Sequence, residues 1–260
     1  AKRQPGSSFK PFVYFTALEK GYEMSSMIED KPVTYGNWSP RNYGNKYSNM
    51  PVSLLQALDK SLNSETVQLM NAVGPDAVID RAKKAGFTSD IPRELSISLG
   101  TMSVSPLELA RAYATFANGG YKVTAYVIDK IYDSQNNLKA QMQPLVAGET
   151  APQVIDPRNA FIMDSMLQTV TRSGTAARAQ ATLKRPDLYG KTGTTNDAMD
   201  AWFAGFQPNL VAVTWIGYDT PRNLGSLDIS VGGDTFQVFT DSSQADQLRL
   251  AARKHGRTHR

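Results

Sequence analysis

The chain has 260 residues, of which 41% are hydrophobic and 20% charged, as expected for one large globular domain or two small ones. It contains no cysteine, which excludes disulfides, thiolate catalysis and cysteine-ligated zinc. The net charge is +4, but residues 236–260 carry +3 of it, so the rest of the chain lacks the basic face that a nucleic-acid partner requires.

The first 120 residues are predicted to be mainly helical. Residues 7–20 have apolar positions on one face, a proline in the first turn and a glycine after the end. Residues 25–50 are rich in Gly, Asn, Pro and Tyr and are predicted to form a loop. A Ser-Pro-Leu-Glu capping box starts the last of these helices. The further helices are expected over residues 52–60, 65–73, 75–85 and 106–117.

The second half of the chain is predicted to contain the sheet. Residues 121–132 are β-branched and aromatic and precede a turn sequence at 133–137, which favours a hairpin. A helix is expected from Asp156-Pro157 to about residue 171. Strands are expected over residues 189–194, 201–206 and 210–218, the last two antiparallel because a short turn joins them. The predicted fold class is α+β, an antiparallel sheet flanked by helices with a helix-rich subdomain.

The first candidate motif is Ser7-Ser8-Phe9-Lys10. Residues three apart share a helix face, so the amine of Lys10 can reach the hydroxyl of Ser7. A serine becomes nucleophilic when a neighbouring base takes its proton, and a lysine serves as that base when burial or a second cation lowers its pKa. One Ser-x-x-Lys match is expected by chance in this composition, so an exposed helix start is the alternative.

Two Ser-x-Asn motifs occur. Ser134-Gln135-Asn136 lies in a predicted turn, where these residue types are common, and we interpret it as structural. Ser61-Leu62-Asn63 lies between two predicted helices, where it either caps the second helix or contributes to a site.

The third motif is Lys191-Thr192-Gly193-Thr194, on a predicted strand. Lys191 and Gly193 face one way and Thr192 and Thr194 the other. Gly193 leaves room for a substrate backbone beside the strand, whereas a solvated lysine at a strand start is the alternative. The three motifs, in this order, are the set found in penicillin-binding proteins and serine β-lactamases. We therefore interpret them as one site that uses no metal or cofactor. Both histidines lie in residues 236–260, so no Ser-His-Asp triad is expected in residues 1–235.

Longer stretches carry a family resemblance. Residues 1–234 resemble the transpeptidase domain of class A, bifunctional penicillin-binding proteins, most specifically over residues 3–12, 99–108, 190–197, 200–205 and 215–219. The resemblance implies a D,D-transpeptidase that cross-links peptidoglycan stem peptides ending in D-Ala-D-Ala and is acylated by β-lactam antibiotics.

The resemblance also implies a role for each motif residue. Ser7 would attack the penultimate D-Ala carbonyl, Lys10 would act as its general base, and Ser61 would pass a proton to the leaving amine. The backbone N–H groups of Ser7 and Thr194 would form the oxyanion hole. Substrate binding would fall to Asn63, Lys191, Thr192, Gly193 and Thr194.

The two ends of the chain depart from this family. A transglycosylase domain, a membrane anchor and the first strands of the sheet precede the serine in the family, so we expect a sheet that is incomplete at its N-terminal strands. Residues 1–235 are expected to form the transpeptidase fragment and residues 236–260 an unrelated basic tail. The expected location is the periplasm, on the outer face of the bacterial inner membrane, with membrane attachment only through the absent anchor.

Three other functions compete with this interpretation. Class A β-lactamases deacylate their serine with a glutamate, paired in the family with an asparagine four residues on; no such pair lies between residues 63 and 191. A D,D-carboxypeptidase uses the same residues with water as the acceptor. A non-catalytic β-lactam-sensing domain can carry the same motifs and be acylated.

Overall fold

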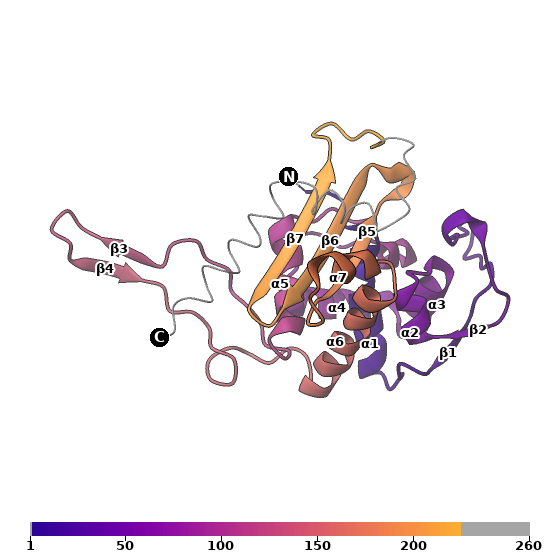
Figure 1. The fold of residues 1–260 in the computed structure, drawn as a ribbon, viewed down its shortest axis with the longest axis horizontal. Helices are drawn as coiled ribbons and strands as arrows, with labels where there is room; N and C mark the ends of the chain where they lie inside the picture. The colour runs from indigo at the N-terminus through magenta and orange to yellow at the C-terminus, as the bar shows by residue number, and fades with distance from the viewer. Residues whose placement is uncertain (1, 225–260) are drawn as a thin grey trace.

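The protein is described by a computed structural model that covers residues 2–224. It has the predicted α+β architecture. The main sheet is antiparallel, with β6 (Asp200–Gln207) between β5 (Tyr189–Thr194) and β7 (Leu210–Gly217). Figure 1 shows this sheet beside a group of helices. In its register, Gly193 lies opposite Trp202 and Thr194 opposite Ala201.

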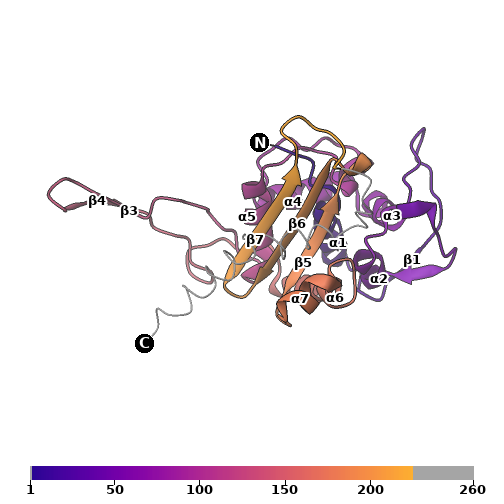
Figure 2. The same ribbon diagram turned by 45° about the horizontal axis from the view of Figure 1, so that its top comes forward.

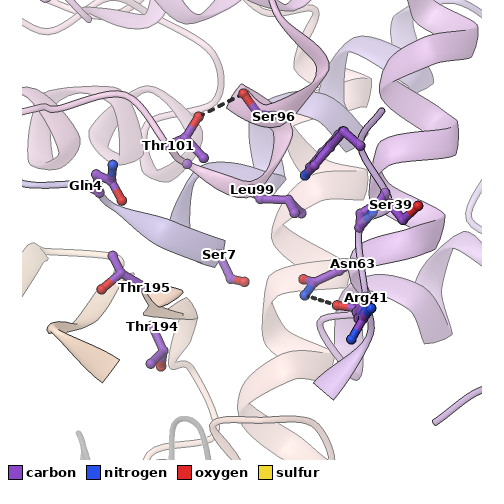
Figure 3. Close-up of a pocket in the computed structure, with 13 residues that line it drawn as sticks. Gln4, Ser7, Ser39, Arg41, Asn63, Ser96, Leu99, Thr101, Thr194 and Thr195 are labelled. Carbon is purple, nitrogen blue, oxygen red and sulfur yellow. Dashed lines mark hydrogen bonds between the residues drawn. The ribbon is translucent and has the colours of Figure 1, made fainter. Parts of the chain in front are cut away.

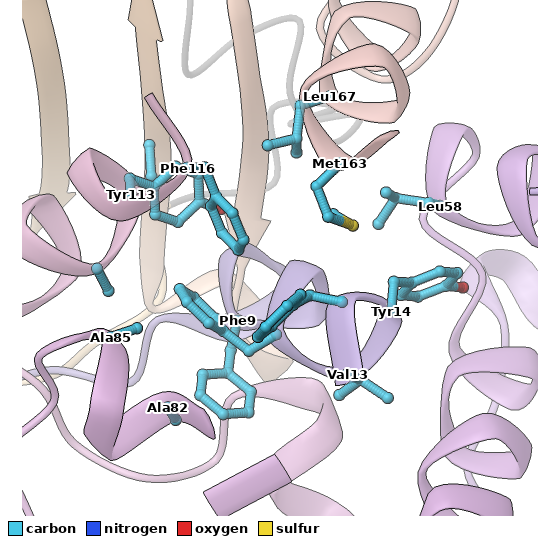
Figure 4. Packing of buried hydrophobic residues seen from close by; sticks show 14 of the residues in the cluster. Phe9, Val13, Tyr14, Leu58, Ala82, Ala85, Tyr113, Phe116, Met163 and Leu167 are labelled. Carbon is cyan, nitrogen blue, oxygen red and sulfur yellow. The ribbon is translucent and has the colours of Figure 1, made fainter. Parts of the chain in front are cut away.

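The helix that follows the first motif runs through the centre of the molecule. A 3-10 turn, η1 (Gly6–Phe9), leads into α1 (Lys10–Glu19), and every α1 residue except Glu19 is buried. Such a helix lies against neighbours on all sides, which is why its sequence has no polar face. It packs against α2 (Leu54–Asp59), α3 (Asn63–Val73), α4 (Pro75–Ala85) and α6 (Pro157–Arg172). Aromatic rings join it to a fifth helix, whose Tyr113 and Phe116 are labelled in Figure 4.

Aromatic side chains hold the start of α1 in place. Phe12 packs edge-on against Phe87, with ring centroids 5.1 Å apart, and also against Phe116 at 5.3 Å. Phe116 and Tyr113 lie on α5 (Pro106–Ala117), which begins at the predicted capping box. The Tyr113 hydroxyl donates a hydrogen bond of 2.7 Å to the carbonyl of Ser8. The serine turn is therefore fixed to a second helix as well as to α1.

The sheet and the helices meet on one side of the core. α5 packs against β6 and β7, and α6 packs against β5. A short helix, α7 (Ala177–Leu183), follows α6 and was not expected from the sequence. The turn η1 contacts β5 and β6 directly, so the serine lies at the edge of the sheet that carries the Lys-Thr-Gly-Thr motif.

The structure corrects the sequence-based elements in two places. The strand predicted over 121–132 is wrong, because only β3 (Lys130–Tyr132) finds a partner strand there, β4 (Leu138–Gln141). Figures 1 and 2 show this hairpin projecting away from the body. The segment predicted as a loop contains β1 (Met27–Glu29), which pairs with β2 (Pro51–Ser53). Short 3-10 helices, also not predicted, occur at η2 (Tyr43–Asn45), η3 (Leu95–Leu99) and η4 (Asn196–Ala198).

Within residues 2–224, no helix combines the length and apolar character needed to span a bilayer. The predicted basic tail, 236–260, lies outside the described residues.

Candidate active site

The serine turn reaches the end of β5 because glycines permit the approach. Gly6 has a φ of +55°, and a Cβ on it would lie 2.6 Å from the carbonyl oxygen of Thr194. At Gly193 the space of a side chain is taken by the carbonyl of Pro5. The sequence suggested that Gly193 makes room for a substrate backbone; in the structure this space is used by the protein's own serine turn.

Lys10 points from the first turn of α1 toward the Ser-x-Asn motif. Its Nζ lies 2.7 Å from the carbonyl of Ser61, 3.1 Å from the carbonyl of Leu62 and 2.6 Å from Oδ1 of Asn63. It also lies 3.3 Å from Oγ of Ser61. Among the described residues, Ser7 Oγ makes no hydrogen bond to Lys10. Catalytic hydrogen bonds are often long before substrate binds.

Lys191 approaches the same serine from the other side. Its Nζ donates a hydrogen bond of 2.9 Å to Oγ of Ser61, which has a backbone φ of +55° at the junction of α2 and α3. Both lysines are fully buried. One hydroxyl therefore contacts two buried amines.

Burial governs the charge of both amines. It is the main cause that holds the pKa of Lys10 well below its usual value, followed by the charge of Lys191, while Glu65 acts in the opposite direction. Burial also lowers the pKa of Lys191 to about 7, against a smaller opposing effect of Asp59. A lysine with a lowered pKa can act as a base near neutral pH.

A cavity of about 310 Å³ lies over the motif residues and is lined by Ser7, Asn63 and Thr194. Figure 3 shows Ser7 pointing into it between the Thr194 end of β5 and Asn63. Two further segments complete its walls, residues 38–41 and residues 99–101. No acidic side chain is among the residues that line this cavity.

The two threonines of the third motif differ. Thr194 lines the cavity, and its buried Oγ1 has no hydrogen-bond partner. Thr192 does not line the cavity; its Oγ1 lies 2.9 Å from Oγ1 of Thr175, in the segment between α6 and α7. The structure therefore brings Ser7, Lys10, Ser61, Asn63, Lys191 and Thr194 to one place and turns the hydroxyl of Thr192 toward a neighbouring loop. The other Ser-x-Asn motif lies in the exposed turn between β3 and β4.

Sequence reasoning missed the residues that support the site. Asn42 accepts hydrogen bonds from the backbone N–H groups of Asn63 and Ser64, at 2.7 and 2.9 Å. Beside it, burial and then a hydrogen bond to Asp30 raise the pKa of Glu65 to about 8. No spacing rule connects residues 30 and 42 to 63, so only the fold reveals this link.

No group of three or more His, Cys, Asp or Glu side chains within residues 2–224 is arranged to hold a metal ion.

Comparisons with known proteins identify the family of this chain. The family model for the penicillin binding protein transpeptidase domain matches residues 1–226, so the chain belongs to that family. Penicillin-binding protein 1A of Neisseria flavescens is 51% identical over 86% of this chain, and that of Pseudomonas aeruginosa is 38% identical over the same share. The chain spans 29% and 34% of the length of these relatives.

A solved structure shows the same fold. The crystal structure of penicillin-binding protein 1A from Haemophilus influenzae superposes with a TM-score of 0.83 at 31% sequence identity. The match covers 93% of this chain and 43% of the other.

Proposed function

We propose that this chain is a serine D,D-transpeptidase that cross-links peptidoglycan stem peptides through an acyl-enzyme on Ser7. The observation that carries the proposal is that Lys10 and Lys191, both buried, contact one hydroxyl, Ser61, beside the cavity into which Ser7 points. Membership of the transpeptidase family supports the choice of reaction.

Acylation begins at Ser7. Lys10, as a neutral amine, takes the proton of the hydroxyl while Oγ attacks the carbonyl of the penultimate D-Ala. The peptide bond then breaks, and the terminal D-Ala leaves as an amine that receives its proton through Ser61. The hydrogen bonds between Ser61 Oγ and both lysines support this path.

The terminal carboxylate of the donor peptide is held at the end of β5. Thr194 Oγ1 is buried without a partner beside the cavity, and Lys191 supplies positive charge nearby. We assign the carboxylate to these two residues and a supporting role to Thr192, whose hydroxyl is bonded to Thr175. The contact of Gly6 with Thr194 supports an oxyanion hole formed by the N–H groups of Ser7 and Thr194.

The amine of a second stem peptide then takes the acyl group from Ser7 and completes the cross-link. β-Lactams resemble D-Ala-D-Ala and acylate the same serine, and they are released slowly because the chain lacks the Glu and Asn pair of class A β-lactamases between residues 63 and 191. We place the reaction in the periplasm, where the stem peptides lie. We propose that no nucleic acid takes part. Membrane anchoring and partner binding are likewise only proposed, for a longer protein that contains this chain.

Labelling with a fluorescent penicillin tests the nucleophile. The chain should be labelled covalently, and Ser7→Ala should abolish the label. Ser134→Ala is the matched control, since Ser134 belongs to the exposed second Ser-x-Asn motif and should be labelled like the wild type. Failure of the folded wild-type chain to be labelled on Ser7 refutes the proposal.

Product analysis identifies the acceptor. A donor peptide ending in D-Ala-D-Ala should give a cross-linked product when an amine acceptor is supplied, with free D-Ala released in equal amount. Release of D-Ala with only hydrolysed donor would favour a D,D-carboxypeptidase. Labelling by penicillin with no release of D-Ala at all would favour a sensing domain.

A further inference from the structure

A loop distant in sequence caps the helix that begins in the Ser-x-Asn motif. Asn42, which is 3% exposed, accepts hydrogen bonds through Oδ1 from the N–H groups of Asn63 (2.7 Å) and Ser64 (2.9 Å). These are the first two residues of α3, and the residue before them, Leu62, has no side chain that can cap the helix. Asn42 thus supplies from another segment the acceptor that a helix start requires.

The other end of the same amide faces two buried carboxyl groups. Nδ2 of Asn42 donates to Oδ1 of Asp30 at 3.1 Å and to Oε2 of Glu65 at 3.2 Å. Asp30 also accepts a hydrogen bond of 2.9 Å from the backbone N–H of Ser48. Because Oδ1 of Asn42 accepts from two N–H groups, its nitrogen must point at the carboxyl pair, and the side chain has one orientation.

One of the two carboxyl groups holds a proton at neutral pH. Burial and then a hydrogen bond to Asp30 raise the pKa of Glu65 to about 8, whereas hydrogen bonds hold the pKa of Asp30 below its usual value despite its burial. A buried polar cluster is rigid when every member has a partner and costly when one does not. Here the Glu65 proton and the Asn42 amide together satisfy both carboxyls.

The network ends at Lys10. The Asn63 side chain accepts from Nζ of Lys10 at 2.6 Å and donates through Nδ2 to the carbonyl of Arg41 at 2.8 Å. Arg41 directly precedes Asn42, so one short stretch of loop fixes both the backbone and the side chain of Asn63. The direction in which Asn63 presents its oxygen to Lys10 therefore depends on residues 41 and 42.

We propose that Asn42, oriented by the hydrogen bonds of its Nδ2 to the buried carboxyls of Asp30 and Glu65, is a positioning residue that sets the Ser61-Leu62-Asn63 segment against Lys10. Asn42 does not touch the substrate; it acts through Asn63. The inference rests on the proposed function, since the rate that it controls is that of acylation on Ser7.

The first test compares Asn42→Ala with Asn71→Ala, an exposed asparagine on the same helix. Displacements of about 1 Å can reduce catalytic rates about 100-fold, so Asn42→Ala should lower the acylation rate constant at saturating fluorescent penicillin by at least about 10-fold. Asn71→Ala should match the wild type. Amide hydrogen exchange at residues 63 and 64 should accelerate only in Asn42→Ala, because those N–H groups lose their acceptor.

A second variant separates positioning from loss of stability. Asn42→Asp keeps an oxygen for the two N–H groups, but its other oxygen faces Asp30 and Glu65 and can bond to them only when a further proton is bound. The titratable groups around it are these two carboxyls, Lys10 beyond Asn63, and Tyr47, whose hydroxyl accepts a hydrogen bond of 3.3 Å from the backbone N–H of residue 42. The acylation rate of Asn42→Asp relative to the wild type should therefore rise as the pH falls from 8 to 6, whereas a merely destabilised protein shows no such recovery.

A third pair tests the carboxyls. Glu65→Gln places an N–H where the Glu65 proton lies and keeps an oxygen for Asn42, so it should retain acylation at neutral pH within about threefold, while Glu65→Ala should behave like Asn42→Ala.

Wild-type labelling on Ser7 together with an unchanged rate in Asn42→Ala overturns only the role of Asn42. Absence of labelling on Ser7 in the wild type overturns the proposed function, and the role of Asn42 with it.

Discussion

Removing the charge of Lys191 should change the pH at which the chain becomes reactive. Each lysine nitrogen contacts the same Ser61 Oγ, at 3.3 Å for Lys10 and 2.9 Å for Lys191, so the two nitrogens are no more than about 6 Å apart. Two unit charges at that distance repel by roughly 3 kcal/mol at an effective dielectric constant of about 20. Below pH 7 Lys191 is mostly charged, because its pKa is about 7. It therefore disfavours a proton on Lys10.

In Lys191→Gln this repulsion is lost while a donor to Ser61 is kept. Lys10 then holds its proton to higher pH, and the acid limb of the acylation profile should move to higher pH. The rate at pH 6 should fall by roughly 10- to 100-fold, since 1.4 kcal/mol corresponds to a factor of ten.

The assay measures the acylation rate constant at saturating fluorescent penicillin between pH 5 and pH 9. Working at saturation separates the pH effect from weaker binding of the ligand carboxylate. Lys46→Gln, which removes an exposed lysine, is the control and should leave the midpoint unchanged. A midpoint for Lys191→Gln at the wild-type pH or below it would refute the electrostatic reasoning.

Three further predictions concern the frame of the site. Gly6→Ala should lower the free energy of unfolding by at least about 1 kcal/mol and slow acylation. The new Cβ would clash with the Thr194 carbonyl, and alanine is strained at a φ of +55°. An unchanged denaturant unfolding curve would contradict this close approach. Tyr113→Phe should cost about 1 kcal/mol of stability, since the hydroxyl bonds the Ser8 carbonyl at 2.7 Å, and an unaltered melting temperature would show that this bond contributes nothing. Burial would raise the pKa of Glu108, but backbone and side-chain hydrogen bonds hold it below its usual value of 4.5. Its contribution to the free energy of unfolding is therefore complete above pH 4.5 and is lost as the pH falls. Glu108→Gln should make the unfolding free energy fall less steeply with decreasing pH, and an equally steep fall would refute this.

Local signals in the sequence were sufficient to predict several elements. The helices at 75–85 and 106–117 are bounded by prolines and glycines or by a capping box, and both have the predicted limits. The strand over 121–132 was wrong because β-branched and aromatic residues form a long strand only when a partner pairs with them, and the projecting hairpin offers partners for three residues.

The site could be predicted only in part. Each of the three motifs can be recognised from its own short spacing, and the structure brings their side chains together except that of Thr192. Asn42 and Tyr113 could not be found in this way, because they act through contacts between distant segments. Asn42 binds the N–H groups of Asn63 and Ser64, and Tyr113 binds the carbonyl of Ser8. Such contacts follow from packing, which a single sequence does not encode at a readable spacing.

The burial of every α1 residue except Glu19 has a consequence for the way such a protein can evolve under antibiotic pressure. A change on this buried surface disturbs Lys10 and the adjoining turn that carries Ser7, whichever ligand binds there. Residues 38–41, by contrast, line the cavity from a partly exposed segment outside the core. Substitutions that exclude a bulky β-lactam and leave Ser7 and Lys10 in place are therefore expected among these four residues.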